Sequence, residues 1–173
     1  MFSNADYKTL FKNMQNGFAY HKVIFDEHNK PVDYIFLEVN SAFETFTGLK
    51  GKEIINKKVS EVIPDIRHAT TDLISIYGNV ALTGESAKLD LYFEPFRKWY
   101  SVNAYCPEKG YFVSLFDDIT DKIEMQIDLK KRVKDLQDFY DMAVNREVKM
   151  KELKVELAKL SSELAKLKNK PAY

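Results

Sequence analysis

The apolar residues of the first 120 positions follow short helical and strand periods that predict a mixed fold. Near the N-terminus, apolar residues fall at i, i+3, i+4 and i+7, on one face of a short helix that Gly17 ends. They are Tyr7, Leu10, Phe11 and Met14. The β-rich runs 18–26 and 32–40 flank the polar segment 27–31, which predicts a hairpin. The segment 41–48 begins with serine and ends with glycine, which predicts a short capped helix.

A longer helix and three more strands complete the predicted domain. The helix follows a shorter helix and loop over 50–64, ends at Gly84, and has an inner face formed by Ile66, Ala69, Leu73, Ile76, Tyr77 and Val80. Strands are then predicted over 87–93, 98–106 and 111–119. Strands that follow one another along the chain pair antiparallel. The order therefore predicts an α+β fold, with a five-stranded antiparallel sheet and helices on one face.

From residue 125 onward the apolar positions follow a heptad repeat, which predicts a long coiled-coil helix. Arg132 and Arg146 interrupt the first half of the apolar seam, whereas Met150–Leu167 is uninterrupted. A helix of about 50 residues is about 75 Å long, too long for its stripe to pack on so small a domain. We therefore expect a homodimer, parallel or antiparallel. The predicted interface residues are Leu136, Phe139, Met150, Leu153, Leu157, Leu160, Leu164 and Leu167.

The distribution of helix breakers divides the chain in the same way. All six glycines lie at or before Gly110, and of the five prolines only Pro171 lies beyond Pro107. We therefore expect an N-terminal flanking helix over 1–16, a globular domain over 17–120 and a coiled-coil helix over 121–170.

Charge and cysteine content argue against several classes of protein. The formal net charge is zero, so composition does not favour nucleic acid or an anionic membrane as a partner. The single cysteine, Cys106, excludes an intrachain disulfide framework. The N-terminus lacks the pattern of a signal peptide, and no window approaches the ~18 apolar residues of a membrane span. We expect a cytoplasmic protein with no nucleic-acid or membrane partner.

Three short motifs resemble those of PAS domains, and they occur in the order that this family has. The segment Asn40–Gly48 resembles the Asn-x-x-Phe…Thr-Gly signature of the first PAS helix, and Lys98–Tyr105 resembles the penultimate strand. Asp118–Thr120 matches the Asp-Ile-Thr that closes a PAS core and starts its signalling helix. The resemblance covers roughly residues 15–120 and implies a sensory module.

The resemblance also implies a coupling between the sheet and the C-terminal helix. The side chains of Asp118 and Thr120 can cap the start of that helix. In the family the aspartate pairs with a basic residue of the sheet, and Arg97 and Lys98 are the two candidates here.

Polar residues within the apolar strands are candidates for the lining of a ligand cavity. They are Ser101, Asn103 and Ser114, and the helical residues Leu73 and Tyr77 would border the same cavity. Because alternate residues of a strand face opposite sides of a sheet, each of the three could equally face outward. The sequence names no ligand, so the cofactor is unknown.

Residues that would indicate a kinase or a prosthetic group are not placed for that chemistry. His21, His28 and His68 all precede the C-terminal helix, so histidine kinase activity is excluded. In haem-binding PAS sensors the ligand would fall near Leu73 rather than at His68. Photoactive flavin domains carry a cysteine on a helix, whereas Cys106 lies on a predicted strand. Haem and photoactive flavin are therefore not supported.

Three other patterns have simpler explanations. Gly48–Glu53 lacks the spacing of a phosphate loop. Asp117 and Asp118 have no third ligand nearby, so they indicate a helix start rather than a metal site. The basic run Lys130–Lys134 is short and flanked by acidic residues, unlike a DNA-binding basic region.

These observations predict a non-catalytic sensor that homodimerises and passes a ligand- or partner-induced change through its C-terminal helix. The alternative is a ligand-free scaffold or adaptor that serves dimerisation or docking. The downstream protein is not identified by the sequence.

Overall fold

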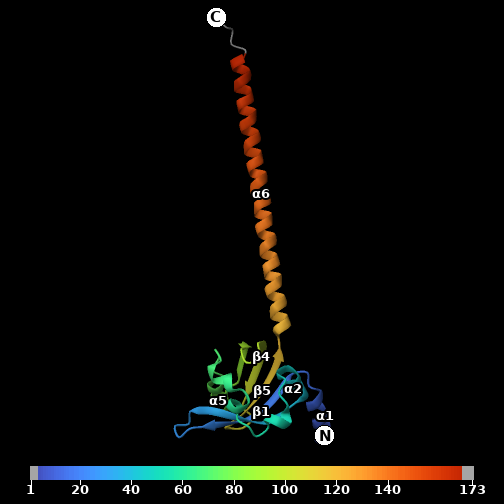
Figure 1. Ribbon diagram of the computed structural model, residues 1–173, viewed down its shortest axis with the longest axis vertical. Helices are drawn as coiled ribbons and strands as arrows, with labels where there is room; N and C mark the ends of the chain where they lie inside the picture. Colours follow the sequence, from blue (N-terminus) through green and yellow to red (C-terminus); the bar gives the residue numbers. More distant parts are fainter. Residues whose placement is uncertain (1–3, 169–173) are drawn as a thin grey trace. The chain divides into compact units, whose positions relative to one another are not determined.

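The computed structural model describes residues 4–168, with side chains described for residues 8–162. The chain divides into two compact units, residues 1–123 and 124–173. The sheet and the short helices belong to the first unit, and most of the long helix α6 belongs to the second (Figure 1). The domain bounds 1–16, 17–120 and 121–170 stay predictions, and parts of the first and last of these ranges lie outside the described residues.

Five strands form one antiparallel sheet, as predicted. They are β1 (Gly17–Phe25), β2 (Pro31–Val39), β3 (Ala87–Phe93), β4 (Lys98–Tyr105) and β5 (Tyr111–Asp118). Their order across the sheet is β2-β1-β5-β4-β3, and each neighbouring pair is antiparallel. The first strand therefore pairs with the last, so both ends of the domain's sequence meet at the centre of the sheet.

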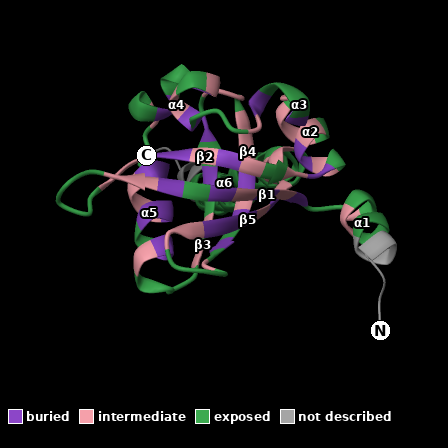
Figure 2. Cartoon of the chain, turned by 90° about the horizontal axis from the view of Figure 1, so that it is seen from below, coloured by how far each residue is buried: buried purple, intermediate pink, exposed green. Residues whose placement is uncertain are grey.

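Short helices cover the face of the sheet that carries the core. They are α2 (Ser41–Thr47), α3 (Gly51–Ile54), α4 (Val59–Val62), the 3-10 helix η1 (Pro64–His68) and α5 (Leu73–Thr83). Their buried apolar residues belong to the same cluster as the inward residues of the strands. Figure 2 shows the buried residues concentrated on the strands and on parts of these helices. A separate helix, α1 (Asn4–Asn13), precedes β1.

Helix caps split one helix that the apolar period predicts into two separate elements. The predicted helix with an inner face from Ile66 to Val80 is two elements, η1 and α5, so that prediction was wrong in its first half. Asp72 starts α5 because its carboxylate accepts hydrogen bonds from the Ser75 amide and hydroxyl. The α2 helix is capped by the side chain of Asn40, and Gly48 ends it with a φ of 76°.

One glycine allows α5 to approach the β1–β2 hairpin closely. A Cβ atom built on Gly78 would lie 2.1 Å from Cβ of Pro31, well inside van der Waals contact. Pro31 is the first residue of β2, and its ring has little freedom to move away. The distance between α5 and this end of the sheet is therefore set by the contact of the α5 backbone at Gly78 with the Pro31 ring.

The helix α6 (Thr120–Lys168) has 49 residues, which corresponds to a length of about 74 Å. The predicted interface residues whose side chains are described are 46% to 70% exposed in this single chain: Leu136, Phe139, Met150, Leu153, Leu157 and Leu160. The side chains of Leu164 and Leu167 lie outside the described ones. Among the described residues, no helix is long and apolar enough to cross a membrane.

Candidate functional site

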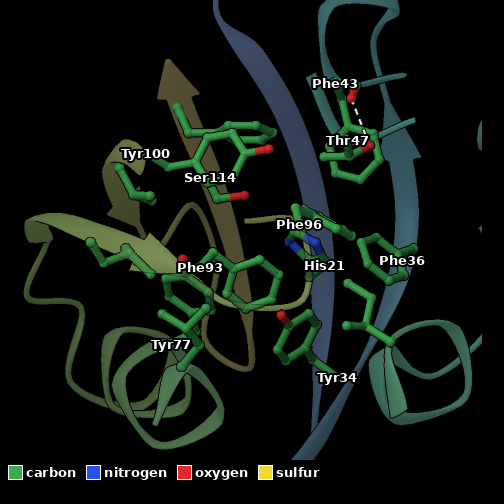
Figure 3. A pocket seen from close by; sticks show the side chains of 15 residues that line it. His21, Tyr34, Phe36, Phe43, Thr47, Tyr77, Phe93, Phe96, Tyr100 and Ser114 are labelled. Atoms are coloured by element: carbon green, nitrogen blue, oxygen red, sulfur yellow. Dashed lines mark hydrogen bonds between the residues drawn. The ribbon is translucent and has the colours of Figure 1, made fainter. Parts of the chain in front are cut away.

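A cavity lies between the inner face of the sheet and helices α2 and α5 (Figure 3). Its volume is about 80 Å³. A single water needs about 10–15 Å³, so the cavity has room for several atoms. Eight of its fifteen lining residues are phenylalanine or tyrosine. The site is therefore a small pocket lined mainly by aromatic rings.

His21 forms part of the cavity wall and belongs to a stack of rings. Its side chain on β1 is stacked on Phe112 of β5, with centroids 4.3 Å apart and planes 13° from parallel. Tyr77 of α5 stacks on Phe112 at 4.7 Å. Tyr34 of β2 meets His21 and Phe112 edge-on, at 5.0 and 5.1 Å. The stack joins three strands to α5 beside the cavity, and edge-to-face and offset contacts of this kind are favourable.

Burial keeps the imidazole of His21 neutral. The residue is 3% exposed, and burial of the ring lowers the pKa of His21 from 6.5 to about 3, although hydrogen bonding to the backbone of Phe112 acts in the opposite direction. Its Nδ1 atom has no hydrogen-bond partner among the residues that the structure describes. A buried polar atom without a partner is uncommon in folded proteins, and it singles this residue out.

The lowered pKa of His21 predicts a specific loss of stability in acid. Above the unfolded-state pKa of 6.5, His21 is neutral in both the folded and the unfolded chain. Between about pH 6.5 and pH 3, His21 is protonated in the unfolded chain but stays neutral in the folded one. Stability should therefore fall as the pH drops through this window, by about 2–3 kcal/mol at about pH 4.5 for this one group. Urea denaturation at neutral pH and at about pH 4.5 measures the difference.

Two variants isolate the contribution of His21 from that of the carboxylates. His21→Phe keeps a ring on Phe112 and should lose this share of the pH dependence. His68→Gln changes an exposed histidine and should keep it. An equal pH dependence in wild type and His21→Phe would show that His21 is not held neutral.

Tyrosine and serine hydroxyls supply the remaining polar atoms of the cavity. Tyr34 lines it from β2, Tyr77 from α5 and Ser114 from β5. Burial raises the pKa of both tyrosines, so their hydroxyl groups stay protonated. The hydroxyl of Thr47 is already engaged, because it donates to the Phe43 carbonyl at 2.8 Å. Figure 3 shows the side chains of Tyr34, Ser114 and His21 around the cavity.

A second cluster of polar contacts lies where β5 ends and α6 begins. Lys98 Nζ lies 2.7 Å from Asp118 Oδ2. Asp118 Oδ1 accepts hydrogen bonds from the amide and hydroxyl of Thr120, at 3.1 and 2.6 Å. The Thr120 hydroxyl oxygen in turn accepts from the Trp99 amide at 3.0 Å. Partial burial acts to raise the pKa of Asp118, but the hydrogen bonds from Lys98 and Thr120 outweigh it, and the pKa is lowered.

The same lysine connects this junction to the cavity wall. Lys98 Nζ also donates to the carbonyl of Phe46, in the last turn of α2, at 3.1 Å. The hydroxyl of Tyr100, which lines the cavity, donates to that carbonyl at 3.0 Å. A cation near the last carbonyls of a helix is favourable. One carbonyl oxygen is thus shared between the cavity wall and the start of α6.

Comparison with known proteins gives no match by sequence: no protein-family model and no curated protein matches the chain. Solved structures do match. An RNA-binding Light-Oxygen-Voltage receptor matches with a TM-score of 0.52 at 13% identity, over 75% of this chain and 36% of that one. Light-Oxygen-Voltage domains are PAS domains. The chain has the PAS fold. It spans about a third of the length of that receptor.

Two further PAS-type structures were found with lower scores. One is a domain of a sensory box sensor histidine kinase/response regulator from Geobacter sulfurreducens, with a TM-score of 0.47 and 13% identity over 66% of this chain and 92% of that one. The other is the PAS domain of a protein from Colwellia psychrerythraea, with a TM-score of 0.45 and 13% identity over 68% and 97%.

Three of the five predicted pocket residues line the cavity, and two do not. Leu73, Tyr77 and Ser114 lie on its wall. Ser101 and Asn103 face the other side of β4, where the Ser101 hydroxyl donates to Asp90 at 2.5 Å and Asn103 is exposed. The prediction was wrong for these two because only the even-numbered residues of β4 face the core.

The junction distinguishes the two candidate partners of Asp118. Lys98 forms the ion pair, whereas Arg97 is an exposed turn residue with a φ of 54°. The choice depended on where the β3–β4 turn ends, and the sequence left that open.

The most unusual residue of the cavity, His21, was not among the predicted pocket residues. From the sequence, the only role weighed for His21 was that of a phosphoacceptor histidine. The strand alternation would have placed it correctly, because Ala19 and Val23 lie two residues to either side and are both buried.

Neither of the two residues that the sequence raised for haem or flavin chemistry, His68 and Cys106, lines the cavity. His68 is exposed on η1, and Leu73 occupies the wall near the expected haem-ligand position. Cys106 follows the end of β4 and is not a lining residue. Within the described part of the chain, no three His, Cys, Asp or Glu side chains are grouped as metal ligands would be.

Proposed function

We propose that this chain is a non-catalytic PAS sensor module that works as a homodimer. A small molecule or a protein partner would change the packing around the cavity, and α6 would pass the change to another protein. The observation that carries the proposal is the shared Phe46 carbonyl, which receives hydrogen bonds from both Tyr100 and Lys98.

Transmission would follow this short series of contacts. A ligand that displaces Tyr100 weakens its bond to Phe46 and leaves Lys98 as the remaining side-chain donor to that carbonyl. The ammonium group then shifts relative to Asp118, which holds the first residue of α6. Such a change alters the geometry at the helix start without unfolding the sheet, a common form of conformational coupling.

The heptad seam of α6 supports the homodimer. Its apolar residues are exposed in a single chain, and a second copy of the same helix would cover them in register. An unpaired helix has little stability of its own, because most helical stability comes from packing of an apolar face. In a dimer, rotation or splay of the two α6 helices changes the distance between them, and a downstream protein can respond to that distance.

Loss of Asp118 should loosen the junction in a measurable way. In the full chain, spin labels attached at Lys134→Cys in a Cys106→Ser background report the distance between the two α6 helices. Asp118→Ala should broaden this distance distribution, because it removes both the ion pair with Lys98 and the cap of Thr120. The cost in stability should be about 1–2 kcal/mol, so the sheet stays folded.

The matched control is Asp121→Ala, which removes a carboxylate from the exposed first turn of α6. It should leave the distance distribution close to that of wild type. Transmission through the junction would be refuted by an Asp118→Ala distribution as narrow as that of the control.

A further inference from the structure

We infer that the cavity binds a small apolar molecule, of about the size of one aromatic ring, which is held by ring contacts without a hydrogen bond to the wall. This names the ligand class of the sensor and rests on the function proposed above. Three properties of the cavity support it: an apolar and uncharged wall, a space that suits a single ring, and an entrance beside the Phe46 carbonyl.

The character of the wall is the first property. The surface that the fifteen lining residues present to the cavity is almost wholly apolar, and none of them is Asp, Glu, Lys or Arg. Two hydroxyl groups of the wall, those of Thr47 and Tyr100, already donate to backbone carbonyls. The unpaired Nδ1 of His21 is itself buried, so a molecule in the cavity cannot reach it. A polar ligand would therefore lose hydrogen bonds to water and gain almost none in return.

The wall also stays uncharged at neutral pH. Burial lowers the pKa of His21 to about 3 and raises the pKa of Tyr34 and Tyr77, so all three side chains are neutral. A carboxylate or ammonium group would lose its hydration here and meet no opposite charge, which is costly. Charged ligands are therefore excluded even more strongly than neutral polar ones.

Size and shape are the second property. The volume of about 80 Å³ is several times what one water needs, so a molecule of several non-hydrogen atoms fits. Water itself gains little from such a site, because apolar cavities stay dry and take up apolar molecules instead. The phenylalanine and tyrosine rings of the wall offer faces and edges to an aromatic ring.

The entrance is the third property. Of the fifteen lining residues, only Thr47 and Phe96 are partly exposed, so a molecule from solvent reaches the cavity past these two (Figure 3). Thr47 follows Phe46, whose carbonyl is shared between the cavity wall and the start of α6. The ring of Phe96 meets that of Tyr100 edge-on, with centroids 6.5 Å apart. A ring that enters here contacts the residues through which the proposed transmission runs.

Titration calorimetry of the full chain with three probes tests this assignment. Toluene is an apolar ring, phenol carries a hydroxyl in place of the methyl group, and benzoate carries a carboxylate. Toluene should bind at least about tenfold more tightly than phenol, because the phenol hydroxyl loses its hydration without gaining a partner. Benzoate should not bind measurably. Phenol affinity equal to or above that of toluene, measurable binding of benzoate, or no binding of toluene would each overturn the assignment.

Two variants with the same substitution locate the bound ring. Ser114→Leu places a larger side chain in the cavity from β5 and should weaken toluene binding at least about tenfold. Ser101→Leu, the matched control, adds the same side chain on the outer face of β4 and should bind toluene as wild type does. A Ser114→Leu chain that binds toluene as tightly as the control would refute binding in the cavity.

Should Ser114→Leu fail to fold, methyl NMR spectra of the wild-type chain give the same information. Toluene should shift the methyl resonances of Leu91 and Val102, which line the cavity, because an aromatic ring changes the shielding of nearby methyl groups. The methyl resonances of Leu115, which faces the other side of β5 from Ser114, should stay in place. Unmoved resonances of Leu91 and Val102 would contradict the assignment.

The ligand class and the transmission can fail separately. The titration measures the affinity of the wild-type cavity for each probe, and Asp118 is not one of its lining residues. Failure of toluene to bind the wild-type chain would refute the ligand class alone. An Asp118→Ala distance distribution as narrow as that of Asp121→Ala would refute the transmission alone.

Discussion

Replacement of Phe112 with alanine is expected to lower the free energy of unfolding of the domain that contains the sheet by about 3–5 kcal/mol. Phe112 is 0% exposed and is the middle ring between His21 and Tyr77. Its removal leaves a void between the central strands and α5, and the neighbouring rings lose their stacking partner. The void adjoins the cavity, so the walls would also be less well defined.

The single tryptophan makes the measurement specific to the sheet. Trp99 lies in β4, and its fluorescence in a urea titration follows this unit without a signal from α6. Tyr105→Ala is the matched control, since Tyr105 is an aromatic residue that is exposed at the end of β4. Tyr105→Ala should lower the free energy of unfolding by less than about 1 kcal/mol. A similar loss in both variants would contradict the central role of the ring stack.

Substitution of Leu160 with lysine is expected to dissociate the proposed dimer. Leu160 is at a d position of the uninterrupted part of the seam, so each dimer would bury two ammonium groups in place of two leucines. Loss of a buried leucine alone costs about 2–5 kcal/mol, and burial of the charge adds to it. Because two leucines are lost per dimer, we expect the dissociation constant to rise at least about a thousandfold.

Sedimentation equilibrium of the full chain gives the dissociation constant directly. Val155→Lys is the matched control: Val155 lies off the seam on the same helix and is 71% exposed, against 53% for Leu160. It introduces the same side chain and should leave the dimer intact. Dimers of equal strength in the two variants would show that the seam is not the interface.

The fold was largely predictable because its strands and turns carry local signals. The alternation of buried residues in β1 and the hairpin before Pro31 follow from two-residue periods and turn composition. The start of α5 was not predicted, because it depends on a side chain of Asp72 that bonds to Ser75 rather than on the apolar period.

The site was less predictable because it depends on register and on atoms far apart in sequence. A shift of one residue decides whether Ser101 faces the cavity or the opposite side, and the composition of β4 does not reveal the shift. The shared carbonyl of Phe46 joins residues more than fifty positions apart, so no local pattern indicates it. His21 did carry a local signal, since its neighbours at 19 and 23 are apolar.

The close approach of Gly78 to Pro31 has a consequence for protein engineering. Because the α5 backbone lies against the Pro31 ring there, α5 has no room to move toward the hairpin, and larger side chains at this contact would strain the fold. Phe96 is different: it lies in the β3–β4 turn, is partly exposed, and lines the cavity. A biosensor for a larger molecule would therefore be built by shortening Phe96, with α5 left unchanged.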